Sequence, residues 1–382
     1  MQLPDREEAI ALLHELVRTP PVVTPRAVDR PLVLYGAGNL GKMAKAYFDR
    51  IGVPVSMVVD ANAAAHRSDP CWQGVRLLAI DDVPKQVRQE AILAICIATS
   101  AYMPIAAGLK RKGWTDITPV YDIIEAYRDR HPLGNGWFTG SLDGDAASIG
   151  KVLGLWHDDR SRAHHLQFIA WHALRQEWHF NGAEVTTEDR YFIPELLALM
   201  HSSERLVDVG AHLGEVTQQF VSHVKGRYRK VTMIEADADN HGACLTVAAQ
   251  YPDMSVLHCA VGATAGRAEF FSGLGYASQL DPRGGDMMDV KTLDTLCSDP
   301  VTYLKLHLEG GELAALQGAL QVISTHRPLI AATAYHNRLG LWKLPMWFFE
   351  NLERYRVLFR LHAWCGTGAV IYALPEERFH KE

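Results

Sequence analysis

The spacing of apolar and polar positions predicts strands and helices that alternate along two stretches of the chain. In the first stretch, the apolar runs 32–35 and 91–98 are typical of buried parallel strands. The segments 39–50 and 103–112, which follow them, have the apolar spacing of amphipathic helices. This alternation indicates a compact parallel-sheet domain.

The same alternation returns in the second half of the chain. Strands are expected at 206–209, 231–235, 255–261, 303–308 and 329–334, and helices at 215–224, 239–250, 312–323 and 345–353. Two last strands, 356–361 and 369–373, follow each other closely, which favours an antiparallel hairpin. A parallel sheet that ends in such a hairpin is not the usual ending of a dehydrogenase.

Between the two stretches, a loop rich in Gly, Pro and Asp at 131–150 is followed by a long predicted helix at roughly 159–180. His165, His172 and His179 recur every seven residues on this helix. Neighbours at that spacing are about 10 Å apart along the axis, too far to share a metal ion. We therefore expect a solvated or interface face there.

These patterns predict an α/β protein of three parts. A Rossmann-like domain with a leading helix covers 1–127, a loop and helical connector covers 128–187, and a second α/β domain covers 188–382.

Composition excludes several classes of function. The net charge of −6 and the lack of a long basic run argue against a nucleic-acid partner. No signal-peptide core and no apolar segment long enough for a membrane span are present, so no membrane partner is expected.

The six cysteines show no metal-ligand spacing and read as reduced thiols of a cytoplasmic protein. No metal site is predicted, and no residue decides between a monomer and a homo-oligomer.

A strand that turns over glycines into a helix is the strongest sign of a ligand site. The predicted strand 206–209 contains Asp208 and is followed by Gly210 and Gly214. Glu235 ends the next strand about twenty residues later, where a carboxylate can accept hydrogen bonds from a ribose. The pairing predicts an adenosyl cofactor.

A second glycine pattern lies in the first domain. Gly36, Gly38 and Gly41 form a complete G-x-G-x-x-G between a predicted strand and a helix, and Asp60 ends the next strand. The pattern fits a dinucleotide or a nucleotide-sugar, with the pyrophosphate at the helix N-terminus and Asp60 on a ribose. A structural or docking role for this domain stays open.

The order of motifs in the second α/β domain resembles the FkbM family of S-adenosylmethionine-dependent methyltransferases over about residues 188–375. The matching segments are Val207-Asp-Val-Gly-Ala-His-Leu-Gly-Glu215, Ile234-Glu235, Val290-Lys-Thr-Leu-Asp294, Leu304-Lys-Leu-His-Leu-Glu-Gly-Gly-Glu312, Ala315-Leu-Gln-Gly-Ala319, Arg327-Pro328, and the tail from Ala334 to Pro345. The resemblance implies a class I methyltransferase sheet, with S-adenosyl-L-methionine as the cofactor. One departure is His307, which stands where the family has an aspartate.

The resemblance also implies which residues contact the cofactor. Asp208 and Glu215 would lie beside its amino-acid end, Glu235 would take the ribose hydroxyls, and Cys259 and Ala260 would flank the adenine. The cofactor-binding set is then Asp208, Gly210, His212, Gly214, Glu215, Glu235, Cys259 and Ala260.

The acceptor side is expected at the ends of the fourth and fifth strands of this domain. His307 and Glu309 alternate onto one face there, and His336 follows the fifth strand. Either histidine could deprotonate an acceptor hydroxyl, and Glu309 could orient one of them or cap the following helix. The loop with Ser278 could act as a lid or as a plain connection.

Three functional hypotheses follow. The first is O-methylation of a hydroxyl on a sugar, a glycan precursor or a related metabolite. The second is a catalytically impaired methyltransferase-like protein that binds a nucleotide-sugar or acts as a scaffold, which the departure at His307 motivates. The third is an NAD-dependent oxidoreductase that uses the segment from Gly36 to Asp60.

Overall fold

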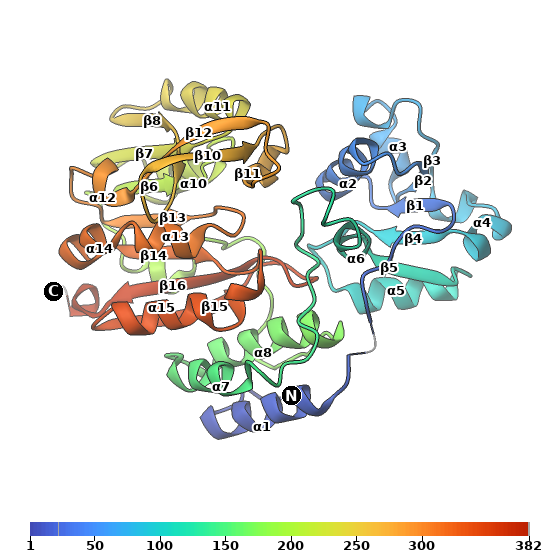
Figure 1. Ribbon diagram of the computed structural model, residues 1–382, viewed down its shortest axis with the longest axis horizontal. Coiled ribbons are helices and arrows are strands. Elements are labelled where there is room, and N and C mark those ends of the chain that lie inside the picture. Colours follow the sequence, from blue (N-terminus) through green and yellow to red (C-terminus); the bar gives the residue numbers. More distant parts are fainter. Residues whose placement is uncertain (22, 381–382) are drawn as a thin grey trace.

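Three β-sheets organise the part of the chain that the structure describes, residues 1–21 and 23–380 (Figure 1). The coordinates are a computed structural model. Two larger sheets form separate α/β domains, and a small sheet lies against the second of them. The α/β class and the closing hairpin predicted from the sequence are confirmed.

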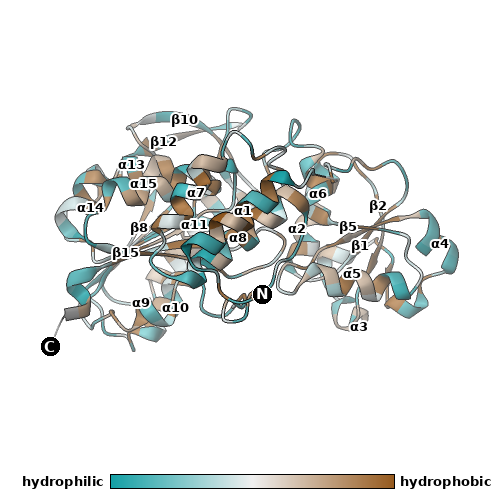
Figure 2. Cartoon of the chain, turned by 90° about the horizontal axis from the view of Figure 1, so that it is seen from below, coloured by the Kyte–Doolittle hydropathy of each residue, from teal (hydrophilic) through white to brown (hydrophobic). Residues whose placement is uncertain are grey.

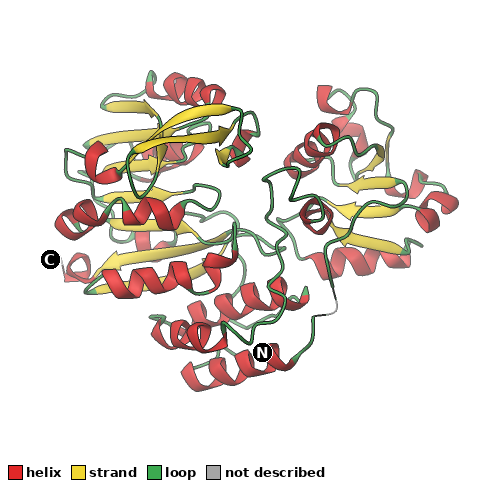
Figure 3. Cartoon of the chain, in the orientation of Figure 1, coloured by secondary structure: helices red, strands yellow, loops and turns green. Residues whose placement is uncertain are grey.

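The first domain has a five-stranded, all-parallel sheet in the order β3-β2-β1-β4-β5. Its central strands β1 and β4 are apolar and almost fully buried because helices cover both faces of the sheet, as Figure 3 shows. Its elements are β1 (Leu32–Tyr35), α2 (Asn39–Arg50), β2 (Val55–Val59), α3 (Ala63–His66), β3 (Leu77–Leu78), α4 (Lys85–Glu90), β4 (Ile92–Ile95), α5 (Tyr102–Arg111), β5 (Asp116–Pro119) and α6 (Val120–Glu125).

The second domain has a seven-stranded sheet in the order β15-β16-β14-β13-β6-β7-β8, in which β16 is antiparallel to both of its neighbours. The strands are β6 (Arg205–Val209), β7 (Lys230–Glu235), β8 (Met254–His258), β13 (Tyr303–Leu306), β14 (Leu329–Thr333), β15 (Tyr355–Leu361) and β16 (Ala369–Pro375). The helices are α9 (Pro194–Leu197), α10 (Glu215–His223), α11 (Ala238–Ala248), α12 (Leu293–Leu296), α13 (Glu312–Gln317), α14 (Leu320–His326) and α15 (Lys343–Asn351). The single helix expected at 312–323 is two helices, interrupted at Gly318.

A small mixed sheet is ordered β11-β10-β12-β9; β9 comes from the end of the strand predicted at 255–261, and the other three strands lie where a loop was expected. Its strands are β9 (Ala260–Val261), β10 (Gly266–Phe271), β11 (Gln279–Leu280) and β12 (Asp286–Lys291). Most of their side chains are exposed or half-buried, so the apolar signal of these strands is weak. The sheet carries the segment 272–280 toward the edge of the large sheet.

The leading helix α1 (Arg6–Arg18) does not belong with the first domain, contrary to the sequence prediction. It packs on α7 (Ala146–Leu155) and α8 (Asp159–Leu174) through Ala9, Leu13 and Leu16. Figure 2 shows these three helices side by side. They form a helical layer against the second domain, where α8 contacts β15.

The histidine face of α8 is buried, so of the two alternatives expected there it is the interface face and not the solvated one. His165 and His172 are fully buried, and the helix ends before His179. His165 accepts a hydrogen bond from the Trp156 indole at Nδ1 and donates one from Nε2 to the carbonyl of Leu341. The face therefore binds the helical layer to the second domain.

None of the helices in the described ranges combines the length and apolarity that a membrane span requires. All six cysteines are unpaired. The predicted bounds 1–127 and 188–382 include residues 22 and 381–382, which lie outside the described residues.

Candidate functional site

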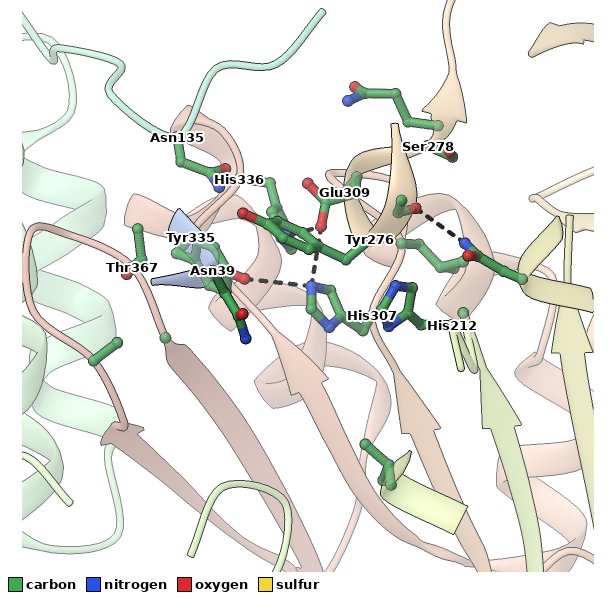
Figure 4. A pocket seen from close by; sticks show the side chains of 18 of the residues that line it. Asn39, Asn135, His212, Tyr276, Ser278, His307, Glu309, Tyr335, His336 and Thr367 are labelled. Atoms are coloured by element: carbon green, nitrogen blue, oxygen red, sulfur yellow. Dashed lines mark hydrogen bonds and ion pairs between the residues drawn. The ribbon is translucent and has the colours of Figure 1, made fainter. Parts of the chain in front are cut away.

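A cavity of about 1290 Å³ lies where the carboxyl ends of the strands of the two large sheets face each other. From the first domain it is lined by residues that follow β1, β2 and β4, such as Gly36, Asp60 and Ile97. From the second it is lined by residues that follow β6 and β7 and lie at the ends of β13 and β14. Figure 4 shows side chains of both domains around this space, including Asn39 and Tyr335. Ligands of α/β proteins bind at this edge of a sheet.

The turn between β6 and α10 brings its backbone to the cavity. Gly210 has a φ of 70°, and a Cβ at this position would lie 1.9 Å from the carbonyl oxygen of His307. Only glycine fits such a close approach in a left-handed conformation. His212, with a φ of 52°, continues the turn and lines the cavity.

The carboxylate of Glu235, at the end of β7, holds this turn in place. Its two oxygens accept hydrogen bonds from the backbone N–H of His212 at 2.7 Å and of Asp237 at 2.9 Å. Burial raises the pKa of Glu235, and the two N–H donors oppose that shift. Each oxygen can accept a further hydrogen bond, so a hydroxyl pair in the cavity could still bind here.

Asp208 lies behind the turn. It is fully buried, with Lys305 Nζ at 2.8 Å and the Thr217 hydroxyl donating to it at 2.9 Å. Lys305 also donates to the carbonyl of Gly210 at 2.7 Å. The pair thus neutralises a buried charge and fixes the carbonyl orientation of the turn.

Most of the predicted cofactor residues line the cavity, but not all of them do. Those that line it are Gly210, His212, Glu215, Glu235, Cys259 and Ala260. Asp208 and Gly214 are not among the lining residues; a Cβ at Gly214 would meet the side chain of Val247 instead.

The segment 272–280 is anchored over the donor side by Asp237, a residue that the sequence analysis missed. Asp237 accepts hydrogen bonds from the Ser278 hydroxyl at 2.7 Å and from the backbone N–H of Gly273 at 2.9 Å. It also caps the N-terminus of α11. The sequence signal that could have identified Asp237 is its position, two residues after Glu235 and at the start of a helix.

The three residues expected on the acceptor side do meet. His307 Nε2 lies 3.0 Å and His336 Nε2 lies 3.2 Å from Glu309 Oε1. Figure 4 shows the three side chains turned toward one another. Their nitrogen and oxygen atoms all lie within 4.8 Å, a grouping that could hold a metal ion and that sequence spacing did not reveal. Glu309 reaches it from a left-handed backbone, with a φ of 48°.

Surrounding side chains complete this cluster. The hydroxyl of Tyr191 lies 2.9 Å from His307 Nδ1, and that of Tyr335 lies 3.3 Å from His307 Nε2. Arg190 donates to the Tyr335 hydroxyl at 3.1 Å. His336 Nδ1 lies 3.0 Å from Glu312 Oε1. No sequence pattern marked Arg190 or Tyr191, which precede the first strand of their sheet.

The three ionisable groups of the cluster have shifted pKa values. Burial lowers the pKa of His307 to about 3. Burial opposes the ionisation of Glu309, but the facing His336 and His307 together outweigh it and lower the pKa of this carboxyl. Burial likewise disfavours the charged form of His336, yet the carboxylates of Glu309 and Glu312 raise its pKa well above the ordinary value. In the absence of another cation, His336 is therefore the positive partner of the two carboxylates.

In the first domain, the glycine loop forms as predicted. Gly36 and Gly38 line the cavity together with Asp60, whereas Gly41 packs against the loop, since a Cβ there would lie 2.0 Å from the carbonyl oxygen of Gly36. Asp60 accepts a hydrogen bond from the backbone N–H of Ala37 at 2.7 Å and so stabilises the loop itself.

Comparisons with known proteins bear on the second domain and on the fold. The family model described as methyltransferase FkbM domain matches residues 208–356. No curated protein matches the chain. Among solved structures, the methyltransferase FkbM from Methylobacillus flagellatus KT is 19% identical and has a TM-score of 0.67 over 96% of this chain and 98% of that chain.

Two further structures are more distant. An rRNA methylase from Streptococcus thermophilus is 12% identical over 47% of this chain and 92% of that chain, with a TM-score of 0.31. The CMeT domain of a citrinin polyketide synthase is 12% identical over 88% and 90% of the two chains, with a TM-score of 0.27. These two likenesses are too weak to define a fold.

The order of the large sheet, its closing hairpin and the likeness that covers nearly the whole chain define a Rossmann-like methyltransferase fold. Within it, residues 208–356 match the model of a methyltransferase FkbM domain, in agreement with the resemblance found in the sequence.

Proposed function

We propose that the protein is an S-adenosylmethionine-dependent methyltransferase that methylates a hydroxyl oxygen of a sugar, a glycan precursor or a related metabolite. One cavity is lined both by the turn at Gly210, with Glu235 beside it, and by the cluster of His307, Glu309 and His336. This observation carries the proposal. One end has the features of an adenosyl site, and the other has groups that can manage a proton.

The donor end fits an adenosyl ligand on its own residues. Glu235 has lone pairs left for two ribose hydroxyls, Gly210 lets the backbone approach the cavity, and His212 lines it. Cys259 and Ala260 offer a small apolar wall suited to an adenine ring. When bound, S-adenosylmethionine supplies a methyl group that an acceptor oxygen takes while the carbon–sulfur bond breaks and its electron pair stays on sulfur.

The acceptor end would place the hydroxyl beside the cluster of His307, Glu309 and His336. These residues would hold the hydroxyl in line with the methyl group, and His307, which burial keeps neutral, would accept its proton. The segment 272–280, fixed by Asp237, would exclude water from the donor side.

Calorimetry with S-adenosylmethionine and S-adenosylhomocysteine tests the donor site. We expect one-to-one binding of both compounds, and a loss of affinity of about ten-fold or more in Glu235→Ala, since the ribose contacts and the turn both depend on this carboxylate. Glu269→Ala, on the exposed side of β10, is the matched control and should bind normally. Absence of binding to the wild-type protein would refute the proposal.

The glycine loop of the first domain favours one alternative function. Because Gly36 and Gly38 line the same cavity, the loop could hold the nucleotide part of a nucleotide-sugar. A nucleotide-sugar-binding protein without transferase activity predicts binding of such compounds but no transfer of label from methyl-labelled S-adenosylmethionine to any acceptor pool. Transfer to a sugar or metabolite fraction would exclude this alternative.

A further inference from the structure

We propose that His307, Glu309 and His336 form a binding site for one divalent first-row transition-metal ion, which holds the acceptor oxygen. The role of the ion in methylation rests on the proposed function, whereas its binding does not. The site lies at the ends of β13 and β14, beside the turn at Gly210 that would receive the donor.

The ligand atoms are already arranged as an ion would require. Both imidazoles direct Nε2 at the same oxygen, Glu309 Oε1, at 3.0 and 3.2 Å. Ligands that surround an ion at about 2.1 Å are separated from each other by about 3 to 3.5 Å. The three ligand atoms all lie within 4.8 Å of one another, so closing the widest separation to about 3.5 Å would complete the coordination.

The outer nitrogen of each imidazole faces a residue that would fix the ring. Tyr191 holds Nδ1 of His307 through its hydroxyl at 2.9 Å, and the carboxylate of Glu312 lies 3.0 Å from Nδ1 of His336. Glu312 is itself held by the Thr333 hydroxyl at 2.6 Å. Carboxylates and hydroxyls behind ligating histidines are typical of metal sites, where they set the tautomer and the ring orientation.

His336 has an unusual environment for a buried histidine. It is 5% exposed, and among the described residues neither of its ring nitrogens makes a hydrogen bond, although carboxylate oxygens lie close to both. Buried polar atoms are normally hydrogen-bonded. Close approach of Nε2 to an oxygen without hydrogen-bond geometry is the arrangement of two ligands of one ion.

The charges around the cluster are compatible with a dication. Glu309 and Glu312 contribute two negative charges, and Lys305 is neutralised by Asp208. Arg190, the remaining nearby cation, lies against the Tyr335 and Tyr191 rings and forms no ion pair with a described carboxylate. A dication bound by His307, Glu309 and His336 would offset the charges of the two carboxylates.

The backbone also brings Glu309 to this position at a cost. Its φ of 48° and that of Gly310 at 107° turn the carboxylate back toward the two histidines. Strained conformations of this kind persist where a site requires them.

The donor set selects the class of metal. Two imidazole nitrogens and one carboxylate favour Mn²⁺, Fe²⁺, Co²⁺ or Zn²⁺ over Mg²⁺ or Ca²⁺. Three protein ligands leave further positions open toward the cavity, where an acceptor hydroxyl can bind. Coordination lowers the pKa of that hydroxyl, so its O–H bond breaks with the proton passing to water, and the oxygen is ready to take the methyl group.

Titration of the chelator-treated full-length protein with Co²⁺ tests the site by visible absorption. We expect one equivalent to give d–d bands, with the bands lost in His336→Ala and in Glu309→Gln, which keeps the shape of the side chain. His14→Ala, on the exposed face of α1, should retain them. Glu312→Gln should weaken Co²⁺ binding by about 10- to 100-fold without abolishing it, because Glu312 acts only through His336.

The outcomes separate this proposal from the proposed function. A wild-type protein that binds S-adenosylhomocysteine but no Co²⁺, or whose bands persist in Glu309→Gln, would overturn the metal site and leave the donor site intact. Co²⁺ binding without any S-adenosylhomocysteine binding would retain the metal site and overturn the methyltransferase. Variants that still bind S-adenosylhomocysteine are folded, so their loss of Co²⁺ binding supports the assignment.

Discussion

The hydroxyl of Tyr276, in the segment over the donor side, lies 2.7 Å from the sulfur of Met43 in α2 of the first domain. The contact joins the two domains directly beside the cavity. It is accompanied by a hydrogen bond from the backbone N–H of Trp364 to the carbonyl of Ala98 at 2.7 Å. The two α/β domains are thus connected by two separate contacts near the cavity.

Tyr276→Phe removes this polar contact and leaves the ring in place. We expect the free energy of unfolding to fall by no more than about 1 kcal/mol, while the segment 272–280 exchanges its amide hydrogens faster. Hydrogen exchange followed by mass spectrometry measures both domains at once. Tyr251→Phe, in a tyrosine remote from α2, is the control, and equal exchange in the two variants would contradict the bridging role.

Gly210→Ala should prevent the turn from forming. The added Cβ would lie 1.9 Å from the carbonyl oxygen of His307, and the φ of 70° is itself unfavourable for alanine. Gly226 has the same φ with no atom within 4 Å, so Gly226→Ala reports the conformational cost alone, about 1 to 2 kcal/mol. Urea unfolding should show a larger loss for Gly210→Ala, and S-adenosylhomocysteine binding should be lost only there. Equal losses of unfolding free energy in the two variants would mean that the turn relaxes around the added Cβ, which would contradict the prediction.

Arg360 should be one of the most sensitive positions outside the cavity. Its guanidinium is buried and lies 2.7 Å from Asp158 and 2.8 Å from Glu195, which joins β15 to the starts of α8 and α9. Arg360→Met leaves both carboxylates unpaired and should cost about 3 to 5 kcal/mol of unfolding free energy. Arg267→Met removes an exposed pair with Asp289 and should cost less than about 1 kcal/mol. Thermal unfolding of the two variants gives the comparison.

The protein should lose stability in mild acid because of His165. Burial lowers its pKa to about 3, whereas an unfolded histidine titrates near about 6.5. As the pH falls, the unfolded chain therefore binds the proton first. The contribution of His165 to the free energy of unfolding is complete above about pH 6.5 and is lost as the pH falls toward 3. Between pH 7 and pH 5 the loss should be on the order of 2 kcal/mol.

His165→Gln isolates that contribution. The variant is expected to be less stable than the wild type at pH 7, because the Trp156 and Leu341 hydrogen bonds are disturbed. Its free energy of unfolding should nevertheless fall less between pH 7 and pH 5. Urea unfolding of both proteins at the two pH values measures this fall. If the unfolding free energy of the variant falls as much as that of the wild type, His165 does not stay neutral in the fold.

The sequence predicted the parts of the fold whose residues carry a periodic apolar pattern. The strands that end at Gly210 and Glu235 and the closing hairpin follow from such patterns. The small sheet was missed because β10 and β12 expose most of their side chains and so lack a buried face. The amphipathic pattern of α1 indicated a buried face but could not indicate which helices cover it.

Residues of the candidate site were easier to predict the closer they lie to the end of a strand. His307 and His336 were expected near one another because they follow β13 and β14, which pair in the same sheet. Their shared contact with Glu309 depends on a left-handed backbone that no pattern marks. Arg190 and Tyr191 reach the cluster only through tertiary packing, so no local signal could identify them.

The facing sheet edges have a thermodynamic consequence. A ligand bound on the loop at Gly36 and a ligand bound on the turn at Gly210 would occupy the same cavity. Both would depend on the same interdomain contacts. The affinity of each occupant then depends on the other, and by linkage the factor is the same in both directions. Measuring the affinity of one ligand at saturating concentrations of the other would express this communication between the domains as a single free energy.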